Sequence, residues 1–228
     1  MPVTLAIDIG GTNLKMMRLD DRGKALEERV KKPTPRPATP LSVLKCLKSM
    51  LAEQGKFDRI SVGFPGVVQA GIIKTAPNLD DGWAEFDFQK ALARFTHKRV
   101  RVANDADIQG YGLVSGKGLE MVITLGTGMG SALFIDGVLL PNLELGHHPF
   151  KNKKTYEDFL GKKAFEKQGV KKWNIHVHEA IALMRKIFNF DRLYVGGGNA
   201  EKITFKPGPD VILAHNIAGL LGGVKLWE

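Results

Sequence analysis

Two glycine-rich turns carry the residue types that bind phosphate. The first is Asp8-Ile-Gly-Gly-Thr12, and the second is Leu125-Gly-Thr-Gly-Met-Gly130. Glycines let backbone N–H groups close around an anion, and threonine adds a hydroxyl donor. Each turn joins two apolar segments, and each second segment runs into an Asp-containing turn, at 20–23 and at 136–137. The repeated hairpin therefore predicts two lobes that hold one phosphoryl chain from opposite sides.

A second group of reactive residues is Asn104-Asp105-Ala-Asp107, which follows a predicted strand at 99–102 and opens a predicted helix at 106–114. The C-terminal end of a strand is where α/β folds place their chemistry. A carboxylate there can take a proton from a substrate hydroxyl, but aspartate is also a favoured helix cap. From the residues alone, Asp105 and Asp107 compete for the catalytic role, and capping is the alternative for both.

Hydrophobic periodicity and turn residues indicate the elements that position these groups. In the first half we expect strands at 3–9, 14–19, 24–31, 60–63 and 99–102, and helices at about 41–55 and 87–95. After the second hairpin we expect helices at 155–168, 173–188 and 216–226 and a strand at 193–195. The order predicts an α/β protein with an N-terminal lobe at 1–103 and a C-terminal lobe at 104–228. The final helix could pack back onto the first lobe.

Composition sets limits on the class of protein. The 228 residues are 43% hydrophobic and 25% charged, which is ordinary for a globular chain. The single cysteine, Cys46, excludes an internal disulfide, and no apolar leader or membrane-spanning run is evident. We therefore expect a cytoplasmic protein. The net charge of +9 suits a polyanionic ligand, but no basic helix, aromatic RNA-binding pattern or Cys/His finger indicates nucleic acid.

Six motifs, in this order, resemble the ROK family of bacterial sugar kinases. They are Asp8-Ile-Gly-Gly-Thr12, Gly63-Phe-Pro-Gly66, Asn104-Asp105, Leu125-Gly-Thr-Gly128, Glu144-Leu-Gly-His147 and Gly196-Gly-Gly198. Within the family, the segments 33–40, 75–80 with Trp83, and 141–147 resemble those of polyphosphate glucokinases. The resemblance implies an actin-like, ribonuclease-H-like two-lobe fold, with sugar and phosphoryl donor meeting in a central cleft.

The resemblance also implies roles in phosphoryl transfer. Asp105 corresponds to the general base, and Asp8 to the residue that holds Mg²⁺ through water. The phosphates would face Gly10, Gly11, Thr12 and Lys15 in the first hairpin and Gly126, Thr127, Gly128 and Gly130 in the second. The alternatives are an aspartate that caps a tight turn, a lysine that is merely exposed on a strand, and a glycine-rich turn without a ligand.

Sugar recognition is assigned by the same resemblance. The residues are Gly66 (through its backbone), Asn78, Asn104, Glu144, His147 and Glu157. Asn78 could instead be only a turn residue, and Glu144 and His147 an ordinary surface acid and a hydrogen-bonded histidine. Many relatives bind a structural zinc with this histidine and three cysteines. Because the segment 149–154 contains no cysteine, we predict no zinc site.

The phosphoryl donor is the least constrained part of the prediction. Gly196, Gly197 and Gly198 resemble the family's adenosine-side motif, although a strand-to-helix turn would also explain them. The following segment is short, so we expect polyphosphate to be used better than ATP. The lysines after residue 150 could form a solvated face or follow a long anionic donor. They are Lys151, Lys153, Lys154, Lys162, Lys163, Lys167, Lys171 and Lys172.

The predicted function is therefore a glucokinase that transfers a phosphoryl group from polyphosphate, and also from ATP, to the 6-hydroxyl of glucose. It would need Mg²⁺, would not bind nucleic acid or membranes, and would form a homodimer as its relatives commonly do. The first alternative is an ATP-dependent ROK kinase for mannose, fructose or an N-acetyl sugar. A lower alternative is a non-catalytic polyanion-binding or sugar-sensing protein.

Overall fold

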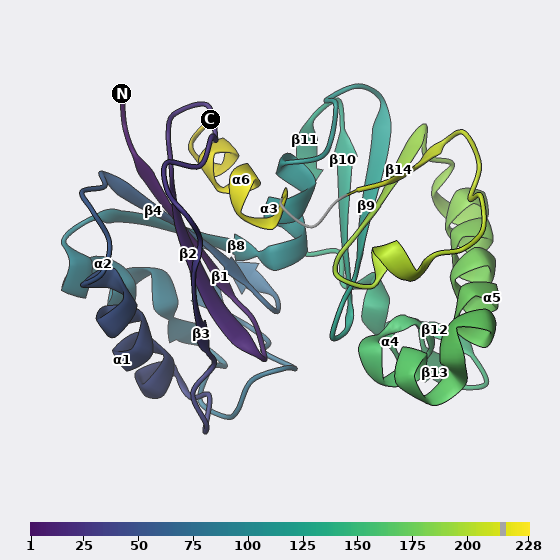
Figure 1. Cartoon of the computed structure of the whole chain (residues 1–228), viewed down its shortest axis with the longest axis horizontal. Helices are drawn as coiled ribbons and strands as arrows, with labels where there is room; N and C mark the ends of the chain where they lie inside the picture. Colours follow the sequence, from purple (N-terminus) through teal and green to yellow (C-terminus); the bar gives the residue numbers. More distant parts are fainter. Residues whose placement is uncertain (215–217) are drawn as a thin grey trace. The chain divides into compact units, whose positions relative to one another are not determined.

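The computed structural model describes residues 1–214 and 218–228, which form two compact units. The first unit comprises Met1–Gly112 and Gly219–Glu228, and the second comprises Leu113–Ala218. Each unit is a twisted sheet with helices packed on it (Figure 1). Among the described residues, no helix has both the length and the apolar character required to cross a bilayer.

The first unit is built on a five-stranded sheet in the order β3-β2-β1-β4-β8. Its strands are β1 (Thr4–Ile9), β2 (Asn13–Leu19), β3 (Val30–Pro33), β4 (Arg59–Phe64) and β8 (Arg99–Asn104). The pairs β1–β2 and β2–β3 are antiparallel, whereas β4 and β8 run parallel to β1. A small sheet holds β5 (Val68–Gln69), β6 (Ile72–Ile73) and β7 (Phe86–Asp87).

Helices bury both faces of this sheet. On one face, α1 (Pro40–Leu51) and α2 (Phe88–Thr96) pack their apolar sides against Leu5, Ile7 and Ile9 of β1. On the other face, Ala6 packs with residues of α6 (Ala218–Leu221) and η3 (Gly222–Trp227), and α3 (Asp105–Tyr111) contacts η3 and β4. Side chains alternate along a strand, so the two faces of β1 have different neighbours.

The second unit is built on the sheet β11-β10-β9-β14-β15. Its strands are β9 (Leu119–Leu125), β10 (Met129–Ile135), β11 (Val138–Leu140), β14 (Arg192–Gly196) and β15 (Val211–Leu213). The remaining elements are η1 (Leu145–His147), β12 (Pro149–Lys151), β13 (Lys154–Thr155), α4 (Glu157–Leu160), α5 (Lys162–Phe188) and η2 (Ala200–Lys202). Apolar residues of α5, including Trp173, Val177 and Ile181, pack against β9 and form the core.

The similarity between the two units extends beyond the hairpins to the whole sheet. In each unit, the strand that leads into the glycine-rich turn is the central strand of the sheet. The next two strands of the chain lie on one side of it, each antiparallel to the strand before it. Two strands that run parallel to the central strand lie on the other side. The sequence predicted only the paired hairpins. The shared strand order places the two glycine-rich turns at equivalent positions of the two units.

Several boundaries differ from the predicted ones. The segment 24–29 is not a strand apart from one bridge, Leu19 to Ala25, and β3 starts only at Val30. Within this segment, Glu27 is held by Arg18 of β2 at 2.6 Å. The two units divide after Gly112 rather than at 103/104, because α3 packs on β4, β8 and η3. Of the predicted helix 216–226, residues 216 and 217 lie outside the described residues. The rest is one α-helical turn followed by a 3-10 helix.

The backbone of the C-terminal segment packs closely against the first unit. A Cβ atom on Gly222 would overlap with the carbonyl oxygen of Ile108 in α3. The hydroxyl of Ser61 donates to the carbonyl of Gly223 and accepts from the indole N–H of Trp227 at 2.8 Å. The C-terminal segment is thereby held on the face of the first sheet that also carries α3.

Candidate functional site

The glycine-rich turn of the first unit is held from outside by two residues of the proline-rich segment. The hydroxyl of Thr34 donates to the carbonyl of Gly10 at 2.5 Å, and the Arg36 guanidinium donates to the carbonyl of Gly11 at 2.7 Å. The amide of Thr34 also donates to the carbonyl of Thr12 at 3.0 Å. With its carbonyls bound in this way, the turn is fixed in one conformation.

Asp8 and Lys15 form an ion pair next to this turn. They occupy paired positions of β1 and β2, and the Lys15 ammonium lies 2.7 Å from the Asp8 carboxylate. Asp8 is on the same sheet face as Ala6, two residues earlier, and pairs with Gly63 of β4. A Cβ atom on Gly63 would be 3.4 Å from the Cα of Asp105. Asp8 and Asp105 therefore flank Gly63 on one face of the sheet.

The structure separates the two competing aspartates of α3. Asp105, the first residue of the helix, is half-buried, whereas Asp107 is 1% exposed. Burial raises the pKa of Tyr111, and the nearby charge of Asp107 raises it further. A substrate hydroxyl needs access to its base, so this burial favours Asp105 over Asp107.

Asn104 is the N-cap of α3 and also fixes the loop after β4. Its side-chain oxygen accepts hydrogen bonds from the amides of Ala106 and Asp107, at 2.8 and 3.3 Å. Its side-chain nitrogen donates to the carbonyl of Gly66 at 3.1 Å. Asn104 thus sets the position of Asp105 and joins it to the Gly63-Phe-Pro-Gly66 loop.

Gly66 and Asn78 are connected through a second loop. A Cβ atom on Gly66 would overlap with the carbonyl of Thr75, and one on Gly11 would lie 3.3 Å from the Cβ of Asn78. The segment 75–80 therefore contacts both the Gly66 loop and the phosphate turn. Within the first unit, the structure brings together the predicted residues of both kinds, for phosphate and for sugar.

Glu157 binds the glycine-rich turn of the second unit. Its carboxylate accepts a hydrogen bond from the amide of Met129 at 3.0 Å, and a Cβ atom on Gly128 would overlap with that carboxylate. On the other side, the amide of Lys162 donates to the carbonyls of Gly126 and Thr127, at 2.9 and 3.2 Å. The turn therefore contacts both α4 and the start of α5.

Glu144, His147 and Glu157 also lie near one another. His147 Nε2 is 3.3 Å from a carboxylate oxygen of Glu144. Burial raises the pKa of Glu144, and while His147 opposes that rise, the charge of Glu157 adds to it. This cluster combines two carboxylates and an imidazole, which can each bind a hydroxyl group.

The Gly196-Gly-Gly198 loop lies against the same turn. Gly197 has φ of 86°, and a Cβ atom there would overlap with the backbone of Leu125. Next to the glycines, the Asn199 amide donates to the carbonyl of Leu125 at 2.8 Å, and its side chain donates to that of Gly126 at 3.2 Å. Within the second unit, the predicted nucleotide motif is therefore adjacent to the predicted phosphate turn.

Comparison with known proteins shows the family. The model of the ROK family matches residues 4–163, which is most of the chain. The chain belongs to the ROK family. It is 33% identical over 205 residues to the polyphosphate glucokinase of Mycobacterium leprae and 34% identical over 208 residues to that of Mycobacterium tuberculosis. These alignments include 86% of this ROK chain, but it spans only 63% and 77% of the two relatives.

A solved structure confirms the fold class of this ROK protein. This chain matches the crystal structure of the inorganic polyphosphate/ATP-glucomannokinase from Arthrobacter sp. strain KM. The TM-score is 0.90, the sequence identity is 30%, and the match covers 100% of both chains. The mixed α/β fold predicted from the sequence, that of the actin-like two-lobe sugar kinases, is therefore the fold of this chain.

The sequence reasoning missed two residues at the site of this ROK protein. Thr34 and Arg36 bind the first phosphate turn, and both come from the segment 33–40, to which the family resemblance assigned no contact. Arg36 also lies 3.4 Å from Asp80. Asp80 in turn accepts from the amide of Ala38 at 2.6 Å. The sequence does contain a signal for this contact, because Arg36 lies between two prolines, and a stiff segment can hold a cation at a fixed place.

Proposed function

We propose that this ROK protein is a glucokinase that transfers a phosphoryl group from inorganic polyphosphate, and also from ATP, to the 6-hydroxyl of glucose. The observation that carries the proposal is its likeness, over the full length of both chains, to a polyphosphate/ATP-glucomannokinase. The two relatives with the same kind of name, polyphosphate glucokinase, support the same donor and sugar.

Asp105 is the proposed general base. Its carboxylate accepts the proton of the glucose 6-hydroxyl as that oxygen bonds to the terminal phosphorus of the donor. The bond from that phosphorus to the bridging oxygen breaks, and the shortened polyphosphate or ADP leaves. Because such transfers depend mainly on positioning and charge stabilisation, the fixed place of Asp105 at the end of β8 supports this role.

Asp8 fits an Mg²⁺ ion that is shared with the phosphates. Protein sites for Mg²⁺ typically use one or two carboxylates together with substrate phosphates, and Asp8 supplies one carboxylate beside the glycine-rich turn. Among the described residues, no three His, Cys, Asp or Glu side chains are grouped as a metal site. When bound, the ion would neutralise charge on the phosphates. Lys15 holds the Asp8 carboxylate and adds a positive charge.

The residues proposed to bind glucose hydroxyls are, within the first unit, Asn78, Asn104 and the backbone near Gly66. Within the second unit they are Glu144, His147 and Glu157. Fixed polar groups select a sugar because a wrong hydroxyl pattern leaves some of them unpaired. Asn104 and Glu157 have a second task here, since they also hold the α3 helix and the Met129 amide. Mannose is a second candidate sugar, favoured by the name of the Arthrobacter enzyme.

Replacing Glu144 with glutamine should separate sugar binding from stability. The variant loses a charged partner for a sugar hydroxyl, so the KM for glucose should rise about 10- to 100-fold. Since the pKa of Glu144 is raised in the folded protein, its contribution to stability is present at low pH and is lost as the pH rises through that pKa. Without glucose, the variant should therefore match the parent at roughly pH 4 and be more stable at pH 7.

Denaturant unfolding at both pH values and glucose kinetics at pH 7 measure these effects. A matched control is Glu179→Gln, which removes an exposed carboxylate on α5 that is paired with Lys151 at 2.6 Å. The control should leave the KM for glucose unchanged. An unaltered KM in Glu144→Gln would remove Glu144 from the sugar site.

A panel of donors and sugars tests the proposed function. The purified protein is assayed with Mg²⁺, with polyphosphate or ATP as donor, and with glucose, mannose, fructose and N-acetylmannosamine as acceptors. We expect glucose with polyphosphate to give the highest kcat/KM. A clear preference for ATP would refute polyphosphate as the main donor, and activity confined to another sugar would refute the glucokinase assignment.

We also propose that the enzyme acts in the cytoplasm as a homodimer. The support for a dimer is a row of exposed aliphatic residues on α5, namely Ile175, Leu183 and Ile187. Exposed apolar side chains that form a contiguous patch mark protein–protein interfaces. Sedimentation equilibrium should give twice the mass of the 25.0 kDa chain, and a mass of one chain at micromolar concentration would refute the dimer.

A further inference from the structure

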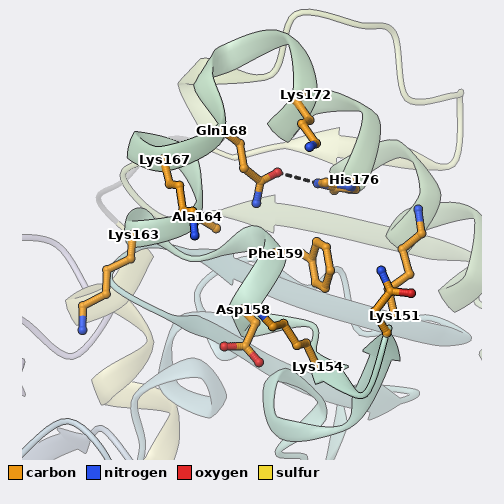
Figure 2. A pocket seen from close by; sticks show the side chains of 11 residues that line it. Lys151, Lys154, Asp158, Phe159, Lys163, Ala164, Lys167, Gln168, Lys172 and His176 are labelled. Atoms are coloured by element: carbon orange, nitrogen blue, oxygen red, sulfur yellow. Dashed lines mark hydrogen bonds between the residues drawn. The ribbon is translucent and has the colours of Figure 1, made fainter.

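A basic pocket of about 460 Å³ lies in the second unit (Figure 2). Five lysines line it, together with one aspartate, one histidine and a few uncharged side chains. The lining residues are Lys151, Asn152, Lys154, Asp158, Phe159, Lys163, Ala164, Lys167, Gln168, Lys172 and His176. They come from the β12–β13 hairpin, α4 and the first half of α5, so three successive segments contribute to one concave surface.

A break in α5 makes the surface concave. Gly169 has φ of 74° and ψ of 163°, which is far from helical and suits only glycine. As a result, His176 Nδ1 lies 2.6 Å from the side-chain oxygen of Gln168, a pair drawn as a dashed line in Figure 2. In a straight helix, residues eight positions apart would be separated by about 12 Å along the axis. The break brings lysines from both sides of Gly169 around one pocket.

The charge of this pocket is largely uncompensated. Lys163, Lys167 and Lys172 have no ion-pair partner within residues 1–214 and 218–228, whereas Lys151 is paired with Glu179. The one acidic lining residue, Asp158, accepts hydrogen bonds from the amide and hydroxyl of Thr155, at 2.9 and 3.0 Å. Its carboxylate is thus already held by the backbone and side chain of Thr155. The pocket has the character of an anion site.

The pKa of His176 is affected by the positive charge of the same pocket. Burial lowers its pKa, and the charges of Lys151 and Lys172 lower it further, while Glu179 acts in the opposite direction. A lowered pKa means that the charged imidazolium is disfavoured among these lysines. The charges of Lys151 and Lys172 thus both act on the side of the pocket where His176 lies.

The pocket begins next to the phosphate turn of the same unit. The backbone amide of Lys162 binds the carbonyls of Gly126 and Thr127, and the next residue, Lys163, lines the pocket. Lys167 follows one helical turn later, about 6 Å further along the axis. A chain of phosphates held at the turn can therefore continue along Lys163 and Lys167 without leaving the protein surface.

We propose that this lysine pocket binds the distal part of the polyphosphate chain, beyond the phosphates at the Gly126–Gly128 turn. The inference rests on the proposed function, because it extends the donor site of the same enzyme. Lysine suits this ligand, since each ammonium is a point charge on a flexible stem and needs no defined base or sugar to recognise. ATP and tripolyphosphate are too short to use both the turn and the whole pocket.

The test compares Lys163→Gln/Lys167→Gln with a control that removes two exposed lysines elsewhere, Lys48→Gln/Lys186→Gln. With long-chain polyphosphate, the pocket variant should show a KM raised about tenfold at an unchanged kcat, because two phosphate contacts are lost. Its KM for ATP and for tripolyphosphate should stay as in the parent. The control should match the parent with all three donors.

Direct binding separates this inference from the proposed function. Calorimetric titration with long-chain polyphosphate, without glucose, should show about tenfold weaker binding to the pocket variant and a smaller dependence on salt. If parent and pocket variant bind polyphosphate with equal affinity, or if the control loses as much affinity as the pocket variant, the pocket does not bind polyphosphate. If the parent binds polyphosphate through the pocket but does not phosphorylate glucose with it, the proposed function is refuted and the proposed binding of polyphosphate by the pocket is supported.

Discussion

Replacing Asp105 with asparagine should lower kcat for glucose phosphorylation by about a thousandfold. The amide keeps the size and the position at the start of α3 but cannot accept the proton of the 6-hydroxyl, and general bases typically contribute factors of 10² to 10⁴. Steady-state kinetics with polyphosphate and with ATP measure the effect. The loss should be the same for both donors, because the base acts on the sugar.

The matched control for this change is Asp107→Asn, two residues further along the same helix. Asp107 is buried, so its replacement should affect stability more than turnover and leave kcat within about tenfold of the parent. Binding of polyphosphate to Asp105→Asn should persist. A normal rate in Asp105→Asn, or a collapse in Asp107→Asn with a normal fold, would contradict the assignment of the base.

Replacing Asn104 with alanine should give the second-largest loss, in both stability and activity. Its side chain makes three hydrogen bonds that connect the start of α3 with Gly66. Loss of an N-cap costs about 0.5–2 kcal/mol, and the buried carbonyl of Gly66 loses a donor as well. We expect the free energy of unfolding to fall by about 2 kcal/mol and kcat/KM for glucose to fall about a hundredfold.

Asn104→Asp is the informative companion variant. Aspartate keeps the oxygen that caps α3 but has no N–H group for the carbonyl of Gly66. It should therefore recover the cap of α3, and with it part of the stability, but little of the activity, because a carboxylate oxygen then faces the carbonyl of Gly66. Denaturant unfolding and glucose kinetics on the two variants decide the matter. Full activity in both would show that the Asn104–Gly66 bond does not hold the site in place.

The sequence predicted the parts of the fold that local patterns encode. The hairpins around both glycine-rich turns were expected because apolar alternation and turn residues occur within a few residues of each other. Helices were predicted at 155–168 and 173–188, and α5 has non-helical backbone between these ranges, at Gly169. The shared strand order of the two sheets was not, since the pairing of β4 with β1 and of β14 with β9 joins segments that are far apart in the chain.

The candidate site was predictable in its residue types but not in its contacts. From the residues alone, Asp105 and Asp107 looked equivalent at a helix start. The family resemblance favoured Asp105, and the structure adds that Asp107 is buried. Glu157 was expected to bind sugar, yet its carboxylate also holds the Met129 amide. Arg36 reaches the phosphate turn from 25 residues away in the chain, and no periodicity encodes that contact. Long-range hydrogen bonds of this kind depend on the completed fold.

The central claim is transfer of phosphate from polyphosphate to the 6-hydroxyl of glucose, and NMR of the product tests it most directly. The purified protein is incubated with Mg²⁺, nucleotide-free polyphosphate and glucose labelled with ¹³C at carbon 6. The account predicts that the carbon-6 resonance shifts and splits through coupling to phosphorus, in the parent and not in Asp105→Asn. An unshifted carbon-6 resonance with the folded parent protein, or phosphate attached at another carbon, would contradict it.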